Sequence, residues 1–249
     1  MLDPLVLAAL GGVAVLAGFV DAVAGGGGLV TVPALLLAGL PPVATLATNK
    51  MQSVIGTMVA AFTFWRRGYV DLRALLPAIA LTFAGSFTGA MVVKKIDTSA
   101  LATAVPVALI AIALYFLFAP HLNDKDRAPR LRFAWFVPVM GAVIGFYDGV
   151  FGPGTGSFMT MAFVVLFGLG LTRASAHTKV LNVTSNLAAL ALFIPSGDVM
   201  WPVAAVMAVG QVVGGYIGAR TGIRFGARII RPLIIVVSMS LAVKLLFFR

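Results

Sequence analysis

Long apolar runs separated by short polar segments occupy almost the whole chain. A helix needs about 20 predominantly apolar residues to cross the hydrocarbon core of a bilayer, so runs of this length restrict the fold severely. The runs fall at about 4–22, 28–40, 43–64, 73–93 and 100–118, and then at about 132–150, 156–170, 174–194, 200–219 and 230–247. This pattern predicts an all-α polytopic membrane protein with about ten transmembrane segments.

The composition excludes several other classes of protein. Hydrophobic residues make up 61% of the 249 residues and charged residues only 10%, whereas soluble domains carry about 25% charged residues. A soluble enzyme, a disordered chain and a coiled coil are therefore excluded. The net charge is +10, but the basic residues lie mostly in short loops, where they set membrane orientation and are not expected to bind nucleic acid. No cysteine is present, which excludes disulfides and thiolate chemistry.

The two halves of the chain repeat one another. The sequence GFVDAV at 18–23 matches GFYDGV at 145–150, which lies 127 residues later, and both are followed by glycine-rich stretches. In a register of 129 residues, ATNK at 47–50 falls on AHTK at 176–179 and GSFTGA at 85–90 falls on GGYIGA at 214–219. Repetition of this extent predicts two copies of one unit. The first copy imitates a signal peptide, but its recurrence in mid-chain makes us expect that it belongs to the fold.

The most polar stretch of the chain separates the two copies. We expect a first transmembrane repeat at 1–119, a cytoplasmic linker at 120–131 and a second transmembrane repeat at 132–249. The loop at 66–73 is basic, while its copy at 195–201 has no basic residue. The positive-inside rule places them on opposite sides of the membrane, which predicts inverted repeats. An even number of crossings with re-entrant hairpins at the glycine-rich motifs is the alternative.

Ionisable residues inside apolar segments are costly, so they are functional candidates. This chain has Asp21, Lys50, Asp148, His177 and Lys179 in such positions, and four of the five match across the repeat. One interpretation is an ion pair within each half, Asp21 with Lys50 and Asp148 with Lys179. The other is that the two lysines hold an anion near the midplane, with Asp21, Asp148 and His177 as candidates for proton coupling. A lone histidine is more often a hydrogen-bonded structural residue.

Glycines and polar side chains surround these charged residues. The stretches 25–28 and 152–156 each precede a short apolar segment, and a helix that begins inside the membrane presents free N–H groups to an anion. From them we select Gly27, Gly28, Gly154 and Gly156; close helix packing is their alternative role. The polar candidates for anion binding are Asn49, Gln52, Thr178, Asn182 and Asn186, which would otherwise hydrogen-bond between helices. We expect no metal and no cofactor, because two distant histidines make a poor ligand set.

At these motifs the sequence resembles the sulfite exporter TauE/SafE family. The resemblance rests on GFVD at 18–21, ATNKMQS at 47–53 and TKVLNVTSN at 178–186, and with the repeat it covers nearly the whole chain. It implies a multi-pass secondary carrier of the bacterial inner membrane for sulfite or organosulfonates such as sulfoacetate. Carried over by residue, it implies substrate contacts at Asn49, Lys50, Gln52, Thr178, Lys179, Asn182 and Asn186. Asn182 stands where the first copy has Ser53, so the half-sites differ.

Two other functions use the same residues. An anion channel would need the same central site, and no sequence feature separates it from a carrier. An intramembrane aspartyl protease would use Asp21 and Asp148 as a dyad, but Thr155 follows the glycines where a second aspartate is expected. We therefore expect a transporter and not an enzyme. Its expected partners are a small anionic substrate and the lipid bilayer, without nucleic acid, and a homodimer is compatible with the sequence.

Overall fold

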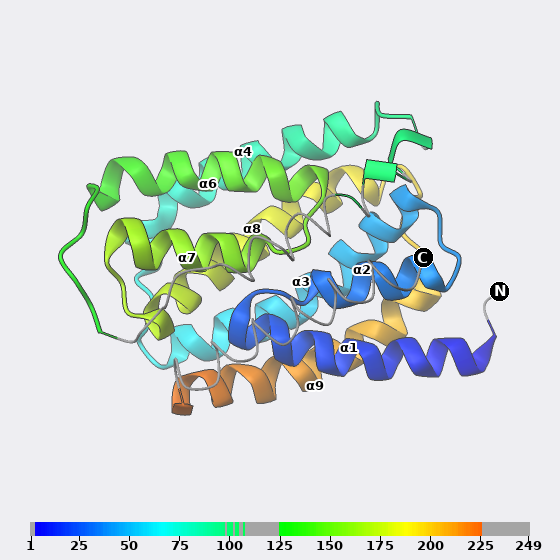
Figure 1. The fold of residues 1–249 in the computed structure, drawn as a ribbon, viewed down its shortest axis with the longest axis horizontal. Helices are drawn as coiled ribbons and strands as arrows, with labels where there is room; N and C mark the ends of the chain where they lie inside the picture. The colour runs from blue at the N-terminus through cyan, green and yellow to red at the C-terminus, as the bar shows by residue number, and fades with distance from the viewer. Residues whose placement is uncertain (1–2, 98, 102, 105–106, 108–124, 226–249) are drawn as a thin grey trace.

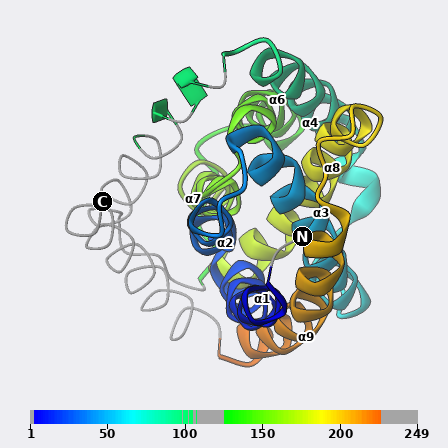
Figure 2. The same ribbon diagram turned by 90° about the vertical axis from the view of Figure 1, so that its right-hand side faces the viewer.

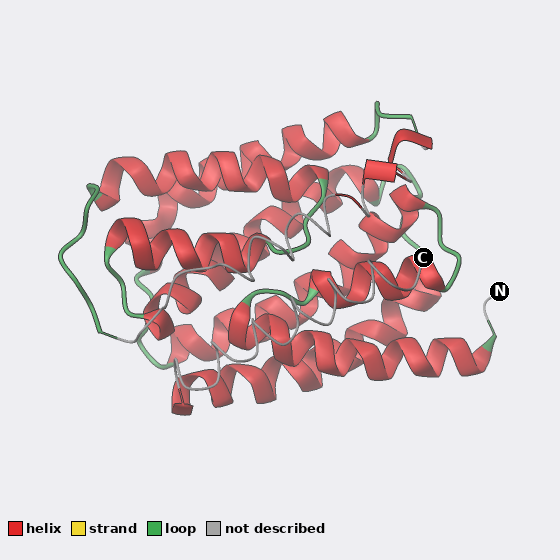
Figure 3. Ribbon diagram, viewed as in Figure 1, coloured by secondary structure: helices red, strands yellow, loops and turns green. Residues whose placement is uncertain are grey.

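The computed structural model describes residues 3–97, 99–101, 103–104, 107 and 125–225. Within these ranges the chain is built of helices and loops (Figure 3). The helices are α1 Pro4–Ala24, α2 Gly28–Leu37, α3 Pro42–Arg66, α4 Leu72–Val93, α6 Phe133–Val150, α7 Thr155–Phe167, α8 Leu171–Phe193 and α9 Trp201–Phe225. They agree with the expected apolar runs to within a few residues. The runs at 100–118 and 230–247 lie largely or wholly outside the described residues.

Helix length and composition divide these elements into three kinds. Within the described residues, α1, α4, α6 and α9 are long and apolar enough to cross a membrane. The helices α3 and α8, with 25 and 23 residues, are long enough but more polar. At 1.5 Å per residue, α2 and α7 are only about 15 and 20 Å long, too short to cross a core about 30 Å thick. The protein is therefore an all-helical polytopic membrane protein with two short helices after its glycine-rich motifs.

Local sequence signals account for where several helices begin and end. Asp3 accepts a hydrogen bond from the N–H of Leu5 at the start of α1, and Asp71 accepts from Arg73 and Ala74 at the start of α4. Such capping satisfies N–H groups that have no partner within the helix. Gly25 ends α1 with φ +80°, a left-handed conformation that glycine adopts without steric cost.

The long helices pack in reciprocal pairs between the two halves. Helix α1 lies along α9, and α6 lies along α4 (Figure 1). A Cβ added to Gly85 would lie 2.2 Å from the carbonyl oxygen of Ala142, and one added to Gly214 would lie 2.1 Å from that of Val15. Gly85 matches Gly214 in the repeat, and Ala142 matches Val15. The same close backbone contact therefore occurs twice, with the two halves exchanged.

This packing places α3 and α8 in the interior of the bundle. The helices α3 and α8 contact each other. Each also packs against a helix of the other half, α3 against α9 and α8 against α4. The view along the bundle shows α2 and α7 beside them (Figure 2). Matching helices of the two halves, α1 and α6, run in opposite directions (Figure 1). The polar helices are thus covered by apolar ones.

Charge is distributed unequally between the two ends of the bundle. Lys94, which follows α4, forms an ion pair with Asp198 at 3.0 Å, so the end of α4 and the loop before α9 share one end. The loop between α3 and α4 lies a helix length away, at the other end. That end also holds Arg220 of α9, which lines a groove with Arg66 and Arg67. We call it the basic end; its described basic residues are Arg66, Arg67, Arg73, Lys125, Arg127, Arg130, Arg132, Arg173, Arg220 and Arg224.

Candidate functional site

The two glycine-rich breaks meet in the middle of the molecule. The N–H of Ser157 donates to the carbonyl of Gly25 at 3.2 Å, and the Ser157 hydroxyl donates to the carbonyl of Ala24 at 2.7 Å. A Cβ on Gly25 would lie 2.3 Å from the carbonyl carbon of Gly156, so no larger residue fits this contact. The break after α1 and the break after α6 therefore touch through their backbones.

Both intramembrane lysines form ion pairs, but each pair joins the two halves. The Nζ of Lys50 lies 2.6 Å from Oδ2 of Asp148, and the Nζ of Lys179 lies 3.0 Å from Oδ2 of Asp21. The interpretation that each ion pair forms within one half is therefore wrong. The physical reason is the reciprocal packing described above, which brings the break of one half against the polar helix of the other. Both lysines are about 1% exposed.

The two lysines differ in their hydrogen bonding. Lys179 donates to the backbone carbonyl of Asp21 as well as to its carboxylate. Lys50, by contrast, has the carboxylate of Asp148 as its single partner within the described residues. The other oxygen of Asp148 accepts from the Thr155 hydroxyl at 2.7 Å. Since an ammonium carries three N–H donors, Lys50 retains donor capacity that Lys179 has largely used.

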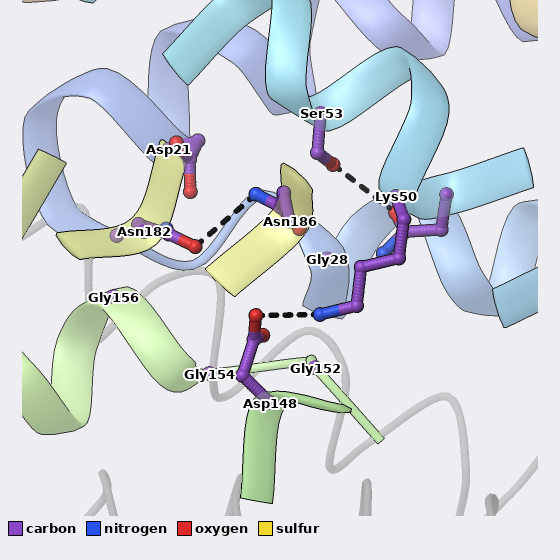
Figure 4. Close-up of a pocket in the computed structure, with 12 residues that line it drawn as sticks. Asp21, Gly28, Lys50, Ser53, Asp148, Gly152, Gly154, Gly156, Asn182 and Asn186 are labelled. Atoms are coloured by element: carbon purple, nitrogen blue, oxygen red, sulfur yellow. Dashed lines mark hydrogen bonds and ion pairs between the residues drawn. The ribbon is translucent and has the colours of Figure 1, made fainter. Parts of the chain in front are cut away.

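A small polar cavity lies at this point (Figure 4). Its volume is about 20 Å³, and a water molecule needs roughly 10–15 Å³ by this measure. The lining residues are Asp21, Gly25, Gly28, Asn49, Lys50, Ser53, Asp148, Gly152, Gly154, Gly156, Asn182 and Asn186. Lys50 and Asp148 point toward each other across it, and Asn186 donates to Asn182 at 3.3 Å. In this conformation the cavity is too small for an oxyanion with several non-hydrogen atoms.

Most of the residues selected from the sequence come together here. Nine of them line the cavity: Asp21, Gly28, Asn49, Lys50, Asp148, Gly154, Gly156, Asn182 and Asn186. The sequence selection omitted Gly25, Gly152 and Ser53, which also line it. The signals for these three were present, because the glycines belong to the two breaks and Ser53 matches Asn182 in the repeat.

Four selected residues lie outside the lining. Gln52 donates to the side-chain oxygen of Asn49 at 2.9 Å, and Thr178 is hydrogen-bonded to the Thr160 hydroxyl at 3.0 Å. The N–H of Gly27 faces Oδ1 of Asp21 at 3.4 Å, and Lys179 is occupied by Asp21. Gln52, Gly27 and Lys179 therefore contact residues of the lining, whereas the partner of Thr178 lies outside it as well.

His177 lies away from the cavity. Its ring nitrogen Nδ1 is 2.8 Å from the carbonyl oxygen of Arg173, one turn earlier in α8. Its ring packs against Phe133 and Phe163, with centroid separations of 5.9 and 5.5 Å. These contacts are those of a histidine in an aromatic cluster.

Comparison with known proteins identifies the family. The family model described as "Sulfite exporter TauE/SafE" matches residues 10–245. The chain belongs to this family. A TauE/SafE relative from Escherichia coli K12, the probable membrane transporter protein YfcA, is 46% identical over 99% of this chain and 92% of its own length. Probable membrane transporter proteins from Sinorhizobium sp. and Haemophilus influenzae are 45% and 43% identical, over 94% and 97% of this chain and 89% and 94% of their own lengths.

Membership of the TauE/SafE family decides the broad class of function. The resemblance seen in the motifs is confirmed, and the chain is a multi-pass membrane transporter and not an enzyme. In bacteria, such as those that carry these relatives, a multi-pass helical protein of this kind lies in the inner membrane. No solved structure matches the chain significantly. The aspartyl protease interpretation is therefore excluded, and the two aspartates need another role.

Proposed function

We propose that this TauE/SafE protein is a secondary transporter for sulfite or organosulfonates such as sulfoacetate, with the central cavity as its anion site. The observation that carries the proposal is the ammonium of Lys50, which is buried, borders the cavity and has one carboxylate as its partner in the described structure. A buried charge with unused donors is costly unless a ligand accepts from it. An anion is the ligand whose charge and acceptor oxygens suit it.

Neighbouring groups add donors suited to an oxyanion. The side-chain amides of Asn49, Asn182 and Asn186 and the hydroxyl of Ser53 line the same cavity. The helices α2 and α7 begin at the two breaks and direct the positive ends of their dipoles toward this region. A sulfonate group presents three oxygens that accept hydrogen bonds, so this arrangement supports a sulfonate or sulfite ligand.

Asp148 gives the site a route to proton coupling. Its carboxylate now occupies the acceptor position at Lys50, so a substrate anion must compete with it. Protonation of Asp148 removes that competing charge and leaves the ammonium for the substrate. The carboxylate of Asp21 likewise occupies an acceptor position at Lys179. We assign proton coupling to these two aspartates, since His177 lies outside the cavity.

The transport cycle requires the site to widen alternately toward each side. We propose two inverted repeats of five segments each, with α2 and α7 re-entrant. The opposite directions of α1 and α6 and the exchanged glycine contacts support this arrangement. The ten basic residues of the basic end support its placement in the cytoplasm. Movement of one repeat-related bundle against the other would then open the small cavity to either side.

Ligand-induced thermal stabilisation of the detergent-purified protein tests the anion site. The panel is sulfite, sulfate, sulfoacetate, taurine, acetate and phosphate, with the wild type, Lys50→Met/Asp148→Asn and Lys94→Gln. The double variant removes the buried cation together with its partner charge, and Lys94→Gln removes an end lysine that is outside the cavity. A ligand at 100 times its dissociation constant adds about 2.7 kcal/mol. We expect a sulfur anion to stabilise the wild type and Lys94→Gln and not the double variant.

Two further measurements separate the parts of the proposal. Binding of a sulfonate, whose own charge is constant, should strengthen in the wild type as pH falls, and Asp148→Asn, which lacks the charge that competes at Lys50, should show a weaker dependence on pH. Counterflow in proteoliposomes indicates a carrier, and unitary currents would indicate a channel with the same site. If no sulfur anion stabilises the wild type at any pH, the substrate assignment is wrong.

A further inference from the structure

A groove at the basic end shares no lining residue with the central cavity. It runs between α3 and α9, has a volume of about 690 Å³, and is lined by Met58, Phe62, Tyr216 and the three arginines Arg66, Arg67 and Arg220, among others. We propose that it binds the headgroup and first acyl-chain segments of an anionic phospholipid from the leaflet that faces the basic end. The argument does not depend on the identity of the transported anion.

The walls of the groove face lipid. Three lining residues, Met58 and Phe62 on α3 and Tyr216 on α9, are about half exposed. Outside the lining, Val213 and Ile217 on α9 are about half exposed as well. An apolar patch of this size is unusual on a surface in contact with water. On two helices of a membrane protein it indicates contact with acyl chains. The apolar part of the groove therefore lies where lipid chains are present.

The three arginines stand where this apolar surface meets the basic end. All three are exposed, and none has an aspartate within 4 Å in the described structure. Arg220 lies over the ring of Tyr216, 4.5 Å from its centroid, and Arg66 lies 5.8 Å from the centroid of Phe62. Stacking on aromatic rings holds a guanidinium in place while its N–H fork remains available. Two such forks, with Arg67 as a third arginine in the lining of the same groove, suit a phosphate.

A second groove continues the surface toward α8. It is apolar, has a volume of about 270 Å³ and shares Met58 and Phe62 with the first groove. Met58 and Phe62 are four residues apart on α3, so they form a ridge with a groove on each side. Trp65 lines the second groove. A lipid with its phosphate at the arginines can place an acyl chain beside this ridge, close to Trp65.

Quenching of Trp65 by brominated lipid tests the site. A variant with Trp135→Phe and Trp201→Phe keeps Trp65 as its single tryptophan and serves as the background. It is titrated in detergent with phosphatidylglycerol or phosphatidylcholine carrying brominated chains. The test variant adds Arg66→Gln, Arg67→Gln and Arg220→Gln. The matched control adds Arg73→Gln, Arg127→Gln and Arg130→Gln, which remove the same charge from the same end outside the groove.

We expect phosphatidylglycerol to quench Trp65 saturably in the background and in the control. The test variant should bind about a hundredfold more weakly, because each basic residue near an anionic lipid contributes about fivefold. Inorganic phosphate and glycerol phosphate should compete poorly, since they lack chains. Equal weakening of the control would reduce the effect to general charge attraction and overturn the proposal. Equal competition by free phosphate, equal quenching by phosphatidylcholine, or burial of Trp65 in a stable dimer would also overturn it.

Discussion

Lys50 and Lys179 occupy matching positions in the two halves, yet their surroundings differ. Lys179 is bound by both the carboxylate and the backbone carbonyl of Asp21, whereas Lys50 has only a carboxylate among the described residues. Asp148 is more deeply buried than Asp21, with side-chain exposures of 2% and 14%. We therefore propose that the Lys50–Asp148 pair exchanges its partner for a ligand, and that the Lys179–Asp21 pair holds α8 against the break after α1.

The exchanged ion pairs predict which double variants recover stability. Lys50→Met leaves the carboxylate of Asp148 buried without its cation, at a cost of about 3–5 kcal/mol. Adding Asp148→Asn removes the unpaired charge and should recover most of that loss. Adding Asp21→Asn should recover none. Apparent unfolding temperatures in detergent measure these differences. If Asp21→Asn recovered the stability and Asp148→Asn did not, Lys50 would be paired with Asp21 of its own half.

Asp126 ties the linker to the start of α8 and should respond to pH. Its pKa is lowered by a hydrogen bond from the N–H of Gly170 and by Arg173, 2.5 Å away. A lowered folded-state pKa means that the ionised form stabilises the fold above the usual pKa of about 4, and that this contribution is lost as pH falls through the folded-state pKa.

Asp126→Asn should therefore lower stability at neutral pH and have less effect in acid. The loss should stay below about 1 kcal/mol, because the pair is half exposed. Unfolding temperatures of the wild type and the variant between pH 3 and pH 7 measure the difference. Asp198→Asn, at the opposite end, serves as a control for a general effect of charge. A difference that grows as pH falls would contradict the assignment.

Individual helices are positioned by glycine contacts as much as by apolar side chains. Gly149 of α6 and Gly214 of α9 each face a backbone carbonyl so closely that an added Cβ would lie 2.1 Å from it. Small residues of this kind let helices approach in a membrane, where the hydrophobic effect does not drive helices together. The contact sets the distance between α6 and α4 and between α9 and α1, and with it the meeting of the two breaks.

Alanine at these glycines should separate the helix pairs. Gly149→Ala and Gly214→Ala each force a backbone shift and should cost about 1–3 kcal/mol. Gly12→Ala on α1 has nothing within 4 Å of the added Cβ and should be neutral or slightly stabilising. Unfolding in detergent compares the three variants. Equal stability of all three would show that these close contacts do not hold the bundle together.

The whole molecule is organised by exchange between its halves. Among the described residues, each long helix of one half packs on a helix of the other, Lys50 and Lys179 each pair with an aspartate of the other half, and the two breaks touch. Neither half holds both members of the Lys50–Asp148 pair or of the Lys179–Asp21 pair. In the transport cycle proposed above, a movement between the halves would therefore change both pairs and the cavity together.

The proposed inverted topology predicts opposite accessibility for matching loops. The chain has no native cysteine, so single cysteines report cleanly. Arg67→Cys and Ser196→Cys lie 129 residues apart in matching, exposed positions. A membrane-impermeant maleimide applied outside intact cells should label Ser196→Cys and not Arg67→Cys. Lys95→Cys should be labelled like Ser196→Cys, and Arg130→Cys should be protected like Arg67→Cys. Labelling of Arg67→Cys and Ser196→Cys from the same side would contradict the inverted arrangement.

The membrane class, the family and most of the residues that line the cavity were predictable from the sequence. Apolar run length, the repeat and the motifs around Lys50 and Lys179 are local features, and each is readable without knowing which helices touch. Which distant residues are in contact became known only from the tertiary structure. It paired Lys50 with Asp148, a residue of the other half, because glycine contacts hold α6 against α4 and the break after α6 lies beside Lys50. It also placed His177 in an aromatic cluster outside the cavity, since the position of a helix face depends on which neighbours it packs against.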